Sequence, residues 1–257
     1  MLTIDLRGQT ALITGASGML GRVIARVFAD CGANLILHYY HGREQAEALA
    51  GELRSKTGRR ILTAYADVTD AESVAEMQRK VAGSAVGMPD ILVHNAVIQY
   101  EQKPLLEQPL ADFDSQYGSC VMQTVHMAKA FVPAMIKKGA GGRIVVINTE
   151  CAALCEEGWS AYSAAKRGLD GIVRVLAKEL GPNGITVNQV APGWTVTEND
   201  RRNHTESRPD YEATVPLRRR GTDEEIAQMC AFLASPLASF TTGAYIPVSG
   251  GRVMPGI

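Results

Sequence analysis

Short apolar runs alternate with amphipathic segments along the whole chain, and this alternation limits the possible folds more than any other feature. The apolar runs, predicted as strands, lie at residues 10–14, 35–37, 61–66, 91–93, 143–148, 186–190 and 244–248. The segments with helical periodicity lie at residues 20–27, 44–55, 71–81, 113–137, 160–180 and 223–233. Unbroken apolar strands are typical of sheets covered on both faces. The pattern therefore predicts an α/β fold, a doubly wound parallel sheet of about seven strands with helices on both faces.

The whole chain, residues 1–257, is predicted to form a single domain. Its length lies between the usual sizes of one and two domains, but no internal repeat, low-complexity segment or linker divides it. Hydrophobic residues make up 46% and charged residues 21%, close to the globular average, which excludes a disordered chain. Residues 201–216 are charged and poor in aliphatic side chains, so a mobile excursion is expected there. The wider segment 194–216, which includes this excursion, is expected to border the substrate.

The charge balance and the hydropathy pattern argue against two classes of partner. Lys plus Arg number 26 and Asp plus Glu number 27, so no basic excess is available to hold a nucleic-acid backbone. The longest uncharged stretch, residues 226–251, is interrupted by Pro236 and Pro247 and is not expected to span a membrane. Residues 1–8 carry charges of both signs and run into a predicted strand, which is not typical of a signal peptide.

Cysteine usage indicates a reducing compartment. The chain has five cysteines, an odd number, and it is long enough to fold without disulfides. Reduced thiols and a cytoplasmic location are therefore expected. Cys151 and Cys155 are four residues apart and no pair of histidines lies near them, so no metal site is expected.

A glycine-rich turn follows the first predicted strand and opens the first predicted helix. Residues 14–21 read Thr-Gly-Ala-Ser-Gly-Met-Leu-Gly. Glycines let the backbone approach a diphosphate, and a helix N-terminus offers free N–H groups and the positive end of its dipole. The predicted cofactor contacts here are Gly15, Ser17, Gly18, Met19, Leu20 and Gly21. The alternative is a tight turn that binds no ligand.

The end of the second predicted strand indicates which dinucleotide binds. No acidic residue stands between Leu37 and Arg43 to accept the hydroxyls of the adenosine ribose. His41 and Arg43, with Tyr39 beside them, are instead suited to a 2′-phosphate, and a guanidinium fits a phosphate well. The sequence therefore favours NADP over NAD. The alternative is that His41 and Arg43 are solvated loop residues.

Tyr162 and Lys166 carry the clearest chemical signal. They are four residues apart in a predicted helix, so both side chains lie on the same face. A free tyrosine is a poor acid–base group at neutral pH, and an adjacent ammonium is expected to lower its pKa. The alternative for such a pair is a solvated helix face. Small neighbours such as Ala161, Ala165 and Gly168 indicate close helix packing instead.

These residues together identify the chain as similar to the short-chain dehydrogenase/reductase family over its whole length. The matching marks are Thr14-Gly15 to Gly21, Asp67-Val68, Asn95-Ala96, Tyr162 with Lys166, Pro192-Gly193 with Thr197, and Ser249-Gly250-Gly251. The resemblance implies a Rossmann-type sheet, a nicotinamide cofactor and hydride transfer to or from a carbonyl carbon.

The resemblance also assigns roles to residues outside the glycine turn. Asp67 and Val68 would contact the adenine. Asn95, Ala96 and Val97 would line the nicotinamide side, and Pro192, Gly193, Thr195 and Thr197 would hold the nicotinamide end. Lys166 would also bind the nicotinamide ribose. The family's long helices pair between subunits, so residues 113–137 and 160–180 imply a homo-oligomer, usually a tetramer.

Four positions depart from the family pattern. Met19 replaces the middle glycine of the turn, which implies a reshaped diphosphate loop. Val97 replaces a glycine. Thr149 stands where the family has a catalytic serine, and its hydroxyl can still donate to a carbonyl oxygen. Cys120 stands where an asparagine holds a relay water, which puts the proton relay in doubt but not the hydride step.

The leading hypothesis is an NADP(H)-dependent carbonyl reductase or alcohol dehydrogenase. Thr149 and Tyr162 would hold the substrate oxygen, and Tyr162 would transfer the proton. One rival is a catalytically weak cofactor-binding regulator or scaffold, because Met19, Val97 and Cys120 depart from the pattern. Another is an epimerase or dehydratase on the same fold that uses Tyr162 for a non-redox step.

The substrate is expected to be a small molecule bound at the carboxyl ends of the strands. Cys151, Trp159 and Trp194 are predicted to line its pocket, and the two tryptophans indicate a flat or ring-containing compound. Either tryptophan could instead pack only against neighbouring loops. Glu150 directly follows Thr149 and is expected to point away from the pocket.

Overall fold

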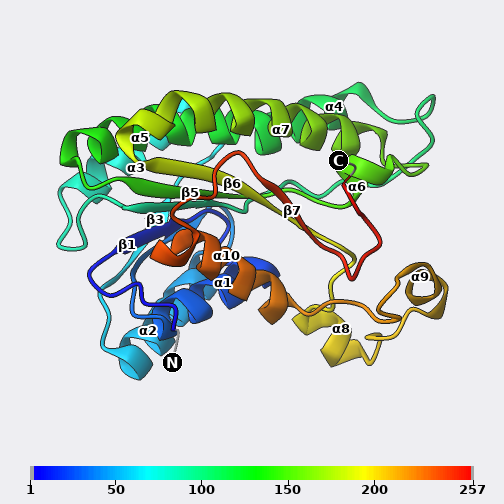
Figure 1. The fold of residues 1–257 in the computed structure, drawn as a ribbon, viewed down its shortest axis with the longest axis horizontal. Helices are drawn as coiled ribbons and strands as arrows, with labels where there is room; N and C mark the ends of the chain where they lie inside the picture. Colours follow the sequence, from blue (N-terminus) through cyan, green and yellow to red (C-terminus); the bar gives the residue numbers. More distant parts are fainter. Residues whose placement is uncertain (1–2, 256–257) are drawn as a thin grey trace.

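The computed structural model describes residues 3–255, and its centre is a seven-stranded parallel sheet. The strand order is β3-β2-β1-β4-β5-β6-β7 (Figure 1). The strands are β1 (Thr10–Ile13), β2 (Asn34–Tyr39), β3 (Ile61–Tyr65), β4 (Ile91–His94), β5 (Gly142–Ile147), β6 (Ile185–Pro192) and β7 (Tyr245–Val248). The predicted doubly wound α/β fold is therefore confirmed.

Helices cover both faces of the sheet (Figure 1). One face carries α1 (Met19–Asp30), α2 (Arg43–Thr57) and α10 (Asp223–Ala234), and the other carries α3 (Ala71–Ala82), α5 (Gln123–Lys138) and α7 (Ser160–Leu180). Alternate strand residues enter the two cores: Ala11 and Ile13 pack toward α1, and Leu12 packs toward α3 and α5. Both cores are fully apolar at these positions, which explains why the strands read as unbroken apolar runs.

The helix predicted at residues 113–137 is longer and has three parts. It consists of α4 (Leu110–Gln116), a π-helical turn η1 (Tyr117–Met122) and α5. A π turn adds a residue to the helical ladder and occurs mostly at functional sites. Apolar periodicity does not reveal it, because both flanking halves are ordinary amphipathic helices.

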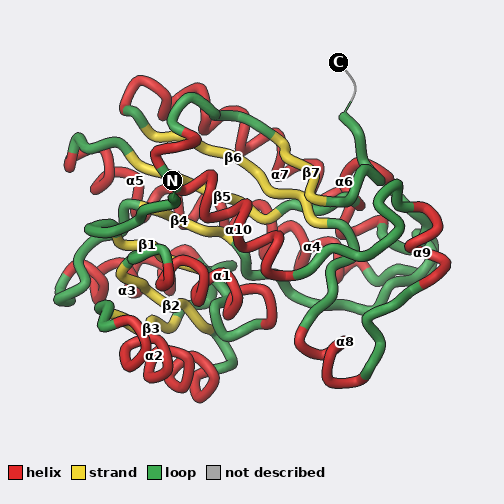
Figure 2. Tube along the Cα trace, turned by 60° about the horizontal axis from the view of Figure 1, so that its bottom comes forward, coloured by secondary structure: helices red, strands yellow, loops and turns green. Residues whose placement is uncertain are grey.

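Residues 194–216 leave the main body beside the carboxyl ends of the strands (Figures 1 and 2). They contain two short helices that the sequence did not predict, α8 (Glu198–Asn203) and α9 (Pro209–Thr214). The buried guanidinium of Arg220 organises this excursion. It donates to the carbonyl oxygens of Trp194 and Thr195 at 3.1 and 2.8 Å and pairs with Asp200 at 3.1 Å.

The remaining elements are short: α6 (Cys151–Leu154) and the 3₁₀ turns η2 (Gly181–Asn183) and η3 (Pro236–Ala238). The sheet order reverses between β1 and β4, so the loops after these strands diverge and leave a crevice where ligands bind in open α/β sheets. Within residues 3–255 no helix is both long enough and apolar enough to cross a membrane.

Candidate active site

The glycine turn forms the tight entry into α1. Gly15 has a φ of +63°, a conformation that L side chains rarely adopt. A Cβ on Gly21 would stand 2.2 Å from the Gly15 carbonyl oxygen, so only glycine lets the helix approach the turn this closely. Gly18 is the N-cap of α1, and Met19 is its first residue and is exposed. A turn of this shape with an open helix N-terminus is suited to a diphosphate, as expected. Leu20 lies within α1 and is only half-buried.

His38 fixes this turn against the neighbouring strands. The Gly15 N–H donates to its Nδ1 at 3.0 Å, and its Nε2 lies 2.9 Å from the Ala66 carbonyl oxygen. This pairing requires the neutral tautomer with the proton on Nε2. Burial lowers the pKa of His38 to about 4. The turn is therefore held by a histidine that stays neutral at physiological pH.

The loop after β2, where the adenosine ribose is expected, presents the two residues predicted to bind a 2′-phosphate. His41 and Arg43 are exposed, and Arg43 is the first residue of α2. Ser17 lies against Gly42, where a Cβ would stand 2.8 Å from the serine hydroxyl, so the glycine turn and this loop adjoin. The ring of Tyr39 contacts that of Tyr65.

Asp67 and Val68 follow β3 directly. The Asp67 carboxylate accepts hydrogen bonds from the Thr69 N–H and hydroxyl at 2.9 and 2.7 Å, which fixes its orientation. The Val68 side chain is buried in the core, so only its backbone can meet a ligand. Its carbonyl oxygen accepts a bond from His126 at 3.1 Å.

Asn95 and Ala96 hold the first strand to the fourth. The backbone N–H groups of Asn95 and Ala96 donate to the Thr14 hydroxyl at 2.8 and 3.0 Å, and the Asn95 amide donates to the Thr14 carbonyl at 3.0 Å. Ala96 lies directly against Gly15. Asn95 therefore shapes the crevice beside the glycine turn, whereas Val97 lines the adjoining cavity.

Tyr162, Lys166 and Thr149 come together as predicted. The Thr149 hydroxyl lies beside the Tyr162 phenol, and the Lys166 ammonium lies 5.5 Å from the centre of the Tyr162 ring. Lys166 is buried and uses one N–H on the Ile147 carbonyl oxygen at 2.6 Å. The Tyr100 hydroxyl accepts from the Tyr162 N–H at 3.1 Å, which caps the first turn of α7.

The expected fall in the pKa of Tyr162 is wrong for the chain by itself. Desolvation of the phenol raises this pKa well above its usual value and outweighs the opposite effect of the nearby Thr149 hydroxyl. Cys120 is buried in the π turn η1, which packs on α7, and lies close enough that an ionised thiol would raise this pKa further. Tyr162 is therefore held in its protonated form, ready to donate.

A cavity of about 780 Å³ opens beside Thr149 and Tyr162. The predicted lining residues Cys151, Trp159 and Trp194 all border it, with Val97, Gly193 and the excursion residue Tyr211. The indole of Trp159 lies 5.7 Å from the Tyr162 ring, and that of Trp194 lies 5.5 Å from the Tyr211 ring. The tryptophans thus form walls of the pocket and are not only loop packing.

The segment expected at the nicotinamide end is shaped by its own hydrogen bonds. The Thr195 hydroxyl donates to the Gly193 carbonyl at 2.9 Å, and Thr197 caps α8 by bonding Asp200. Gly193 follows Pro192 at the end of β6, and a Cβ there would stand 2.6 Å from the Tyr211 hydroxyl. Thr197 is therefore occupied with local structure, while Gly193 lets the excursion close onto the sheet.

The prediction that Glu150 points away from the pocket is wrong. Glu150 is buried and lines the cavity, and its carboxylate accepts from the Tyr211 hydroxyl at 3.0 Å and from Arg252 at 2.8 Å. Burial raises the pKa of Glu150, against the effect of Arg252. Sequence reasoning missed Arg252 and Gln116 as lining residues, and it predicted Tyr211 only as part of the excursion at residues 194–216. The position of Arg252, directly after Ser249-Gly250-Gly251, was the available signal for it.

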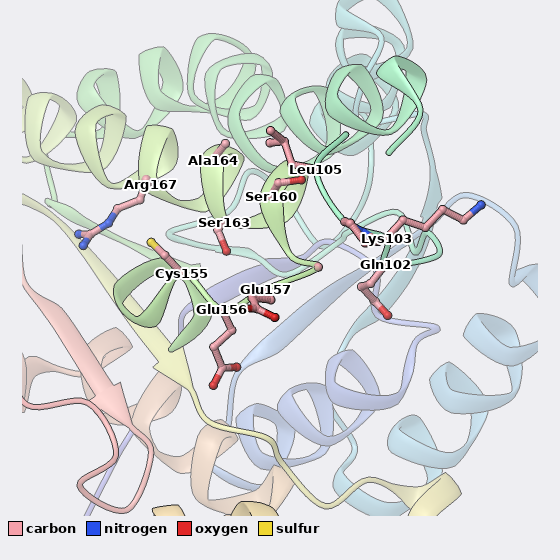
Figure 3. Close-up of a pocket in the computed structure, with 12 residues that line it drawn as sticks. Gln102, Lys103, Leu105, Cys155, Glu156, Glu157, Ser160, Ser163, Ala164 and Arg167 are labelled. Atoms are coloured by element: carbon pink, nitrogen blue, oxygen red, sulfur yellow. The ribbon is translucent and has the colours of Figure 1, made fainter. Parts of the chain in front are cut away.

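A second cavity of about 800 Å³, the outer cavity, is bordered by α7 and by residues 102–105 and 155–158 (Figure 3). Lys103 and Arg167 lie at its opposite ends, and Cys155, Glu157 and Ser163 line it (Figure 3). It contains neither Tyr162 nor Thr149, so the first cavity is the candidate active site. Between residues 3 and 255 no group of three or more His, Cys, Asp or Glu residues could hold a metal ion.

The sheet order, the glycine turn and the Tyr162–Lys166 pair are typical of a dinucleotide-binding α/β protein with an acid–base site. Residues 15–252 match the family model described as enoyl-(acyl carrier protein) reductase. The 3-oxoacyl-(acyl-carrier-protein) reductase FabG of Staphylococcus aureus is 34% identical over 246 residues, which are 96% of this chain and 98% of that protein.

Two similar solved structures extend this finding. A Serratia marcescens short-chain dehydrogenase/reductase mutant has a TM-score of 0.86 and 31% identity, covering 96% of this chain and 99% of that one. L-Sorbose reductase from Gluconobacter frateurii, complexed with NADPH and L-sorbose, has a TM-score of 0.89 and 27% identity, covering 99% and 100%. The chain belongs to the short-chain dehydrogenase/reductase family, and it is an oxidoreductase.

Proposed function

We propose that this chain is an NADP(H)-dependent reductase of small carbonyl compounds, working reversibly on the matching secondary alcohols. The observation that carries the proposal is the meeting of Thr149 and Tyr162 at the wall of one cavity at the carboxyl edge of the sheet, with the buried ammonium of Lys166 5.5 Å from the centre of the Tyr162 ring. A carbonyl oxygen held between the two hydroxyls would receive a hydrogen bond from Thr149 and a proton from Tyr162.

Burial raises the pKa of Tyr162, so the phenol carries its proton at neutral pH but is a weaker acid than a free tyrosine, and the proposed proton transfer needs a positive charge that favours the tyrosinate. As the alkoxide forms, the Lys166 ammonium would stabilise the tyrosinate that remains. The bound nicotinamide would supply the hydride. The glycine turn, with Ser17, Asp67 and Asn95 around it, would hold the dinucleotide, and the close approach at Gly21 fits a cradle of that shape.

A preference for NADP over NAD is supported by the missing acidic residue after β2 and by Arg43 at the start of α2. L-Sorbose reductase, which has the same fold, is complexed with NADPH. Arg43→Ala should weaken NADPH binding by ~1.5–3 kcal/mol, the typical value of a hydrogen bond to a charged group, and leave NADH binding unchanged. Titration of both cofactors checks this. An equal loss for the two would mean that Arg43 does not contact a 2′-phosphate.

The activity is tested by following NADPH oxidation with a panel of ketones, keto sugars and 3-oxoacyl thioesters. The thioesters belong in the panel because a FabG relative named for them is 34% identical to this chain. Steady oxidation with formation of the alcohol is expected for at least one class. No oxidation with any member would favour a cofactor-binding regulator, and product formed without net cofactor use would favour an epimerase or dehydratase.

Cys120 stands where the family has an asparagine that holds a relay water, so it is the candidate residue for returning a proton to Tyr162. If Cys120 occupies the relay position, Cys120→Asn should raise turnover, because an amide carbonyl holds a water better than a thiol does. Unchanged turnover would mean that the proton reaches Tyr162 by another route.

A further inference from the structure

The active-site cavity combines aromatic walls with an unusual charge balance. Five aromatic side chains line it: Tyr100, Trp159, Tyr162, Trp194 and Tyr211. Three carboxylates also line it, from Glu150, Glu156 and Asp210, against a single cationic residue, Arg252. The lining groups therefore carry a formal excess of negative charge.

The one cation of the lining is already engaged. The Arg252 guanidinium pairs with Glu150 at 2.8 Å and with Glu156, and it lies 4.8 Å from the centre of the Tyr211 ring. A ligand carboxylate or phosphate could reach Arg252 only by displacing one of these carboxylates. Arg208 and Arg220 lie over the Trp194 ring, 5.4 and 5.0 Å from its centre, and neither residue lines the cavity.

The negative charge is partly unsatisfied. The Glu150 side chain is 4% exposed, and its Oε2 has no hydrogen-bond partner among the described residues. Burying a carboxylate oxygen in this way costs free energy, and a nearby positive charge would recover part of that cost. Aromatic faces likewise attract cations, most strongly when water is excluded.

We propose that this cavity selects a carbonyl substrate that carries a positively charged amino group and discriminates against carboxylates and phosphates. This inference rests on the proposed function only in calling the ligand a substrate. The cation would lie between the aromatic walls and the Glu150 side of the cavity, with the carbonyl directed at Thr149 and Tyr162.

The direct test is ligand binding, measured through the two tryptophans of the chain. Both tryptophans, Trp159 and Trp194, line the cavity, so quenching of intrinsic fluorescence reports its occupation. The probes are three 1-phenylethanols that differ only in the para substituent: aminomethyl, hydroxymethyl or carboxylate. The aminomethyl compound should bind most tightly and the carboxylate most weakly, with steps on the order of tenfold. A hydroxymethyl compound that binds as tightly as the aminomethyl compound, or a carboxylate that binds as tightly as the hydroxymethyl compound, would overturn the proposal.

Variants then place the selectivity on the named carboxylates. Glu150→Gln should reduce the preference for the aminomethyl over the hydroxymethyl compound by roughly threefold to tenfold. Glu156→Gln alters an exposed side chain and should act in the same direction, so the test does not depend on the folding of the buried variant. Glu157→Gln is the matched control, because Glu157 lines the outer cavity and not this one. Preferences that stay the same in both active-site variants, or that shift equally in Glu157→Gln, would contradict the proposal.

The matching acetophenones separate this inference from the proposed function. If all three ketones resist reduction while the binding order holds, the function is wrong and the charge selectivity stands. If they are reduced but the carboxylate is the best substrate, the function stands and the selectivity is wrong.

Discussion

Tyr162 holds the proton on which the proposed reaction depends, and a single oxygen atom can be removed to test it. Tyr162→Phe keeps the aromatic ring against Trp159 and removes only the hydroxyl beside Thr149. Single-turnover hydride transfer should fall by ~10²–10⁴-fold, as expected for a lost general acid, while the dinucleotide still binds. Tyr117→Phe is the control, because Tyr117 is exposed on the π turn. An unchanged transfer rate in Tyr162→Phe would rule out Tyr162 as the acid.

His38 and His94 make the fold sensitive to acid. Both are buried, and desolvation lowers the pKa of His38 to about 4 and that of His94 to about 3. An unfolded histidine has a pKa of about 6.5, so between that value and the folded pKa the unfolded chain binds more protons. The free energy of unfolding should therefore fall as the pH drops below about 6.5, by ~1.4 kcal/mol per pH unit for each histidine, and these two should contribute no slope above it.

Urea unfolding at several pH values between 7 and 5 measures this slope. His38→Gln should reduce the slope by the contribution of one histidine, because its side chain no longer titrates. A flat profile in the unaltered protein would show that these histidines do not govern its acid stability.

At the scale of elements, the junction of β1 and α1 allows a sharp comparison between two helical glycines. A Cβ on Gly21 meets the Gly15 carbonyl oxygen at 2.2 Å, whereas a Cβ on Gly51 in α2 meets nothing within 4 Å. Gly21→Ala should lower the free energy of unfolding by ~1–3 kcal/mol and weaken NADPH binding, since the diphosphate turn must move. Gly51→Ala should raise stability by ~0.5–1 kcal/mol, because alanine is the better helix former. Equal effects of the two changes on urea midpoints would contradict the close-approach explanation.

Local patterns predicted the elements well where the pattern and the packing coincide. The helix at Ser160–Leu180 begins and ends as expected, because its apolar face packs on the sheet along its whole length. Other features depend on contacts between distant residues. The Glu150–Arg252 pair joins residues 102 positions apart, and the order of the excursion depends on Arg220 reaching back to Trp194. The orientation of Glu150 follows from this distant pairing, so local patterns do not reveal it. Helix α8 does have a local signal, the capping box of Thr197 with Asp200, which the sequence prediction missed.

At the scale of the whole molecule, several large apolar side chains remain at the surface. Leu106 before α4, Leu110 at the start of α4 and Phe240 beyond η3 are each more than four-fifths exposed. Apolar surface of this kind commonly marks an interface between subunits. The family resemblance also implies that the long helices pair between subunits, and we therefore expect a symmetric homotetramer. Light scattering should give a mass about four times that of the 27.6 kDa chain, and a mass near that of a single chain at micromolar concentration would contradict this prediction.

The π turn at Tyr117–Met122 lets the two halves of the long helix direct their apolar faces toward different neighbours. Each residue advances an α-helix by about 100°, so one extra residue rotates the apolar stripe of α5 by that angle relative to α4. As a result, α4 can follow α7 while Met127 and Phe131 of α5 follow the sheet. For the relative orientation of α4 and α5, the number of residues in the π turn therefore matters more than which residues they are. Removing one residue from this turn would force one half of the helix to face the wrong surface, an error that no single side-chain replacement in the turn can imitate.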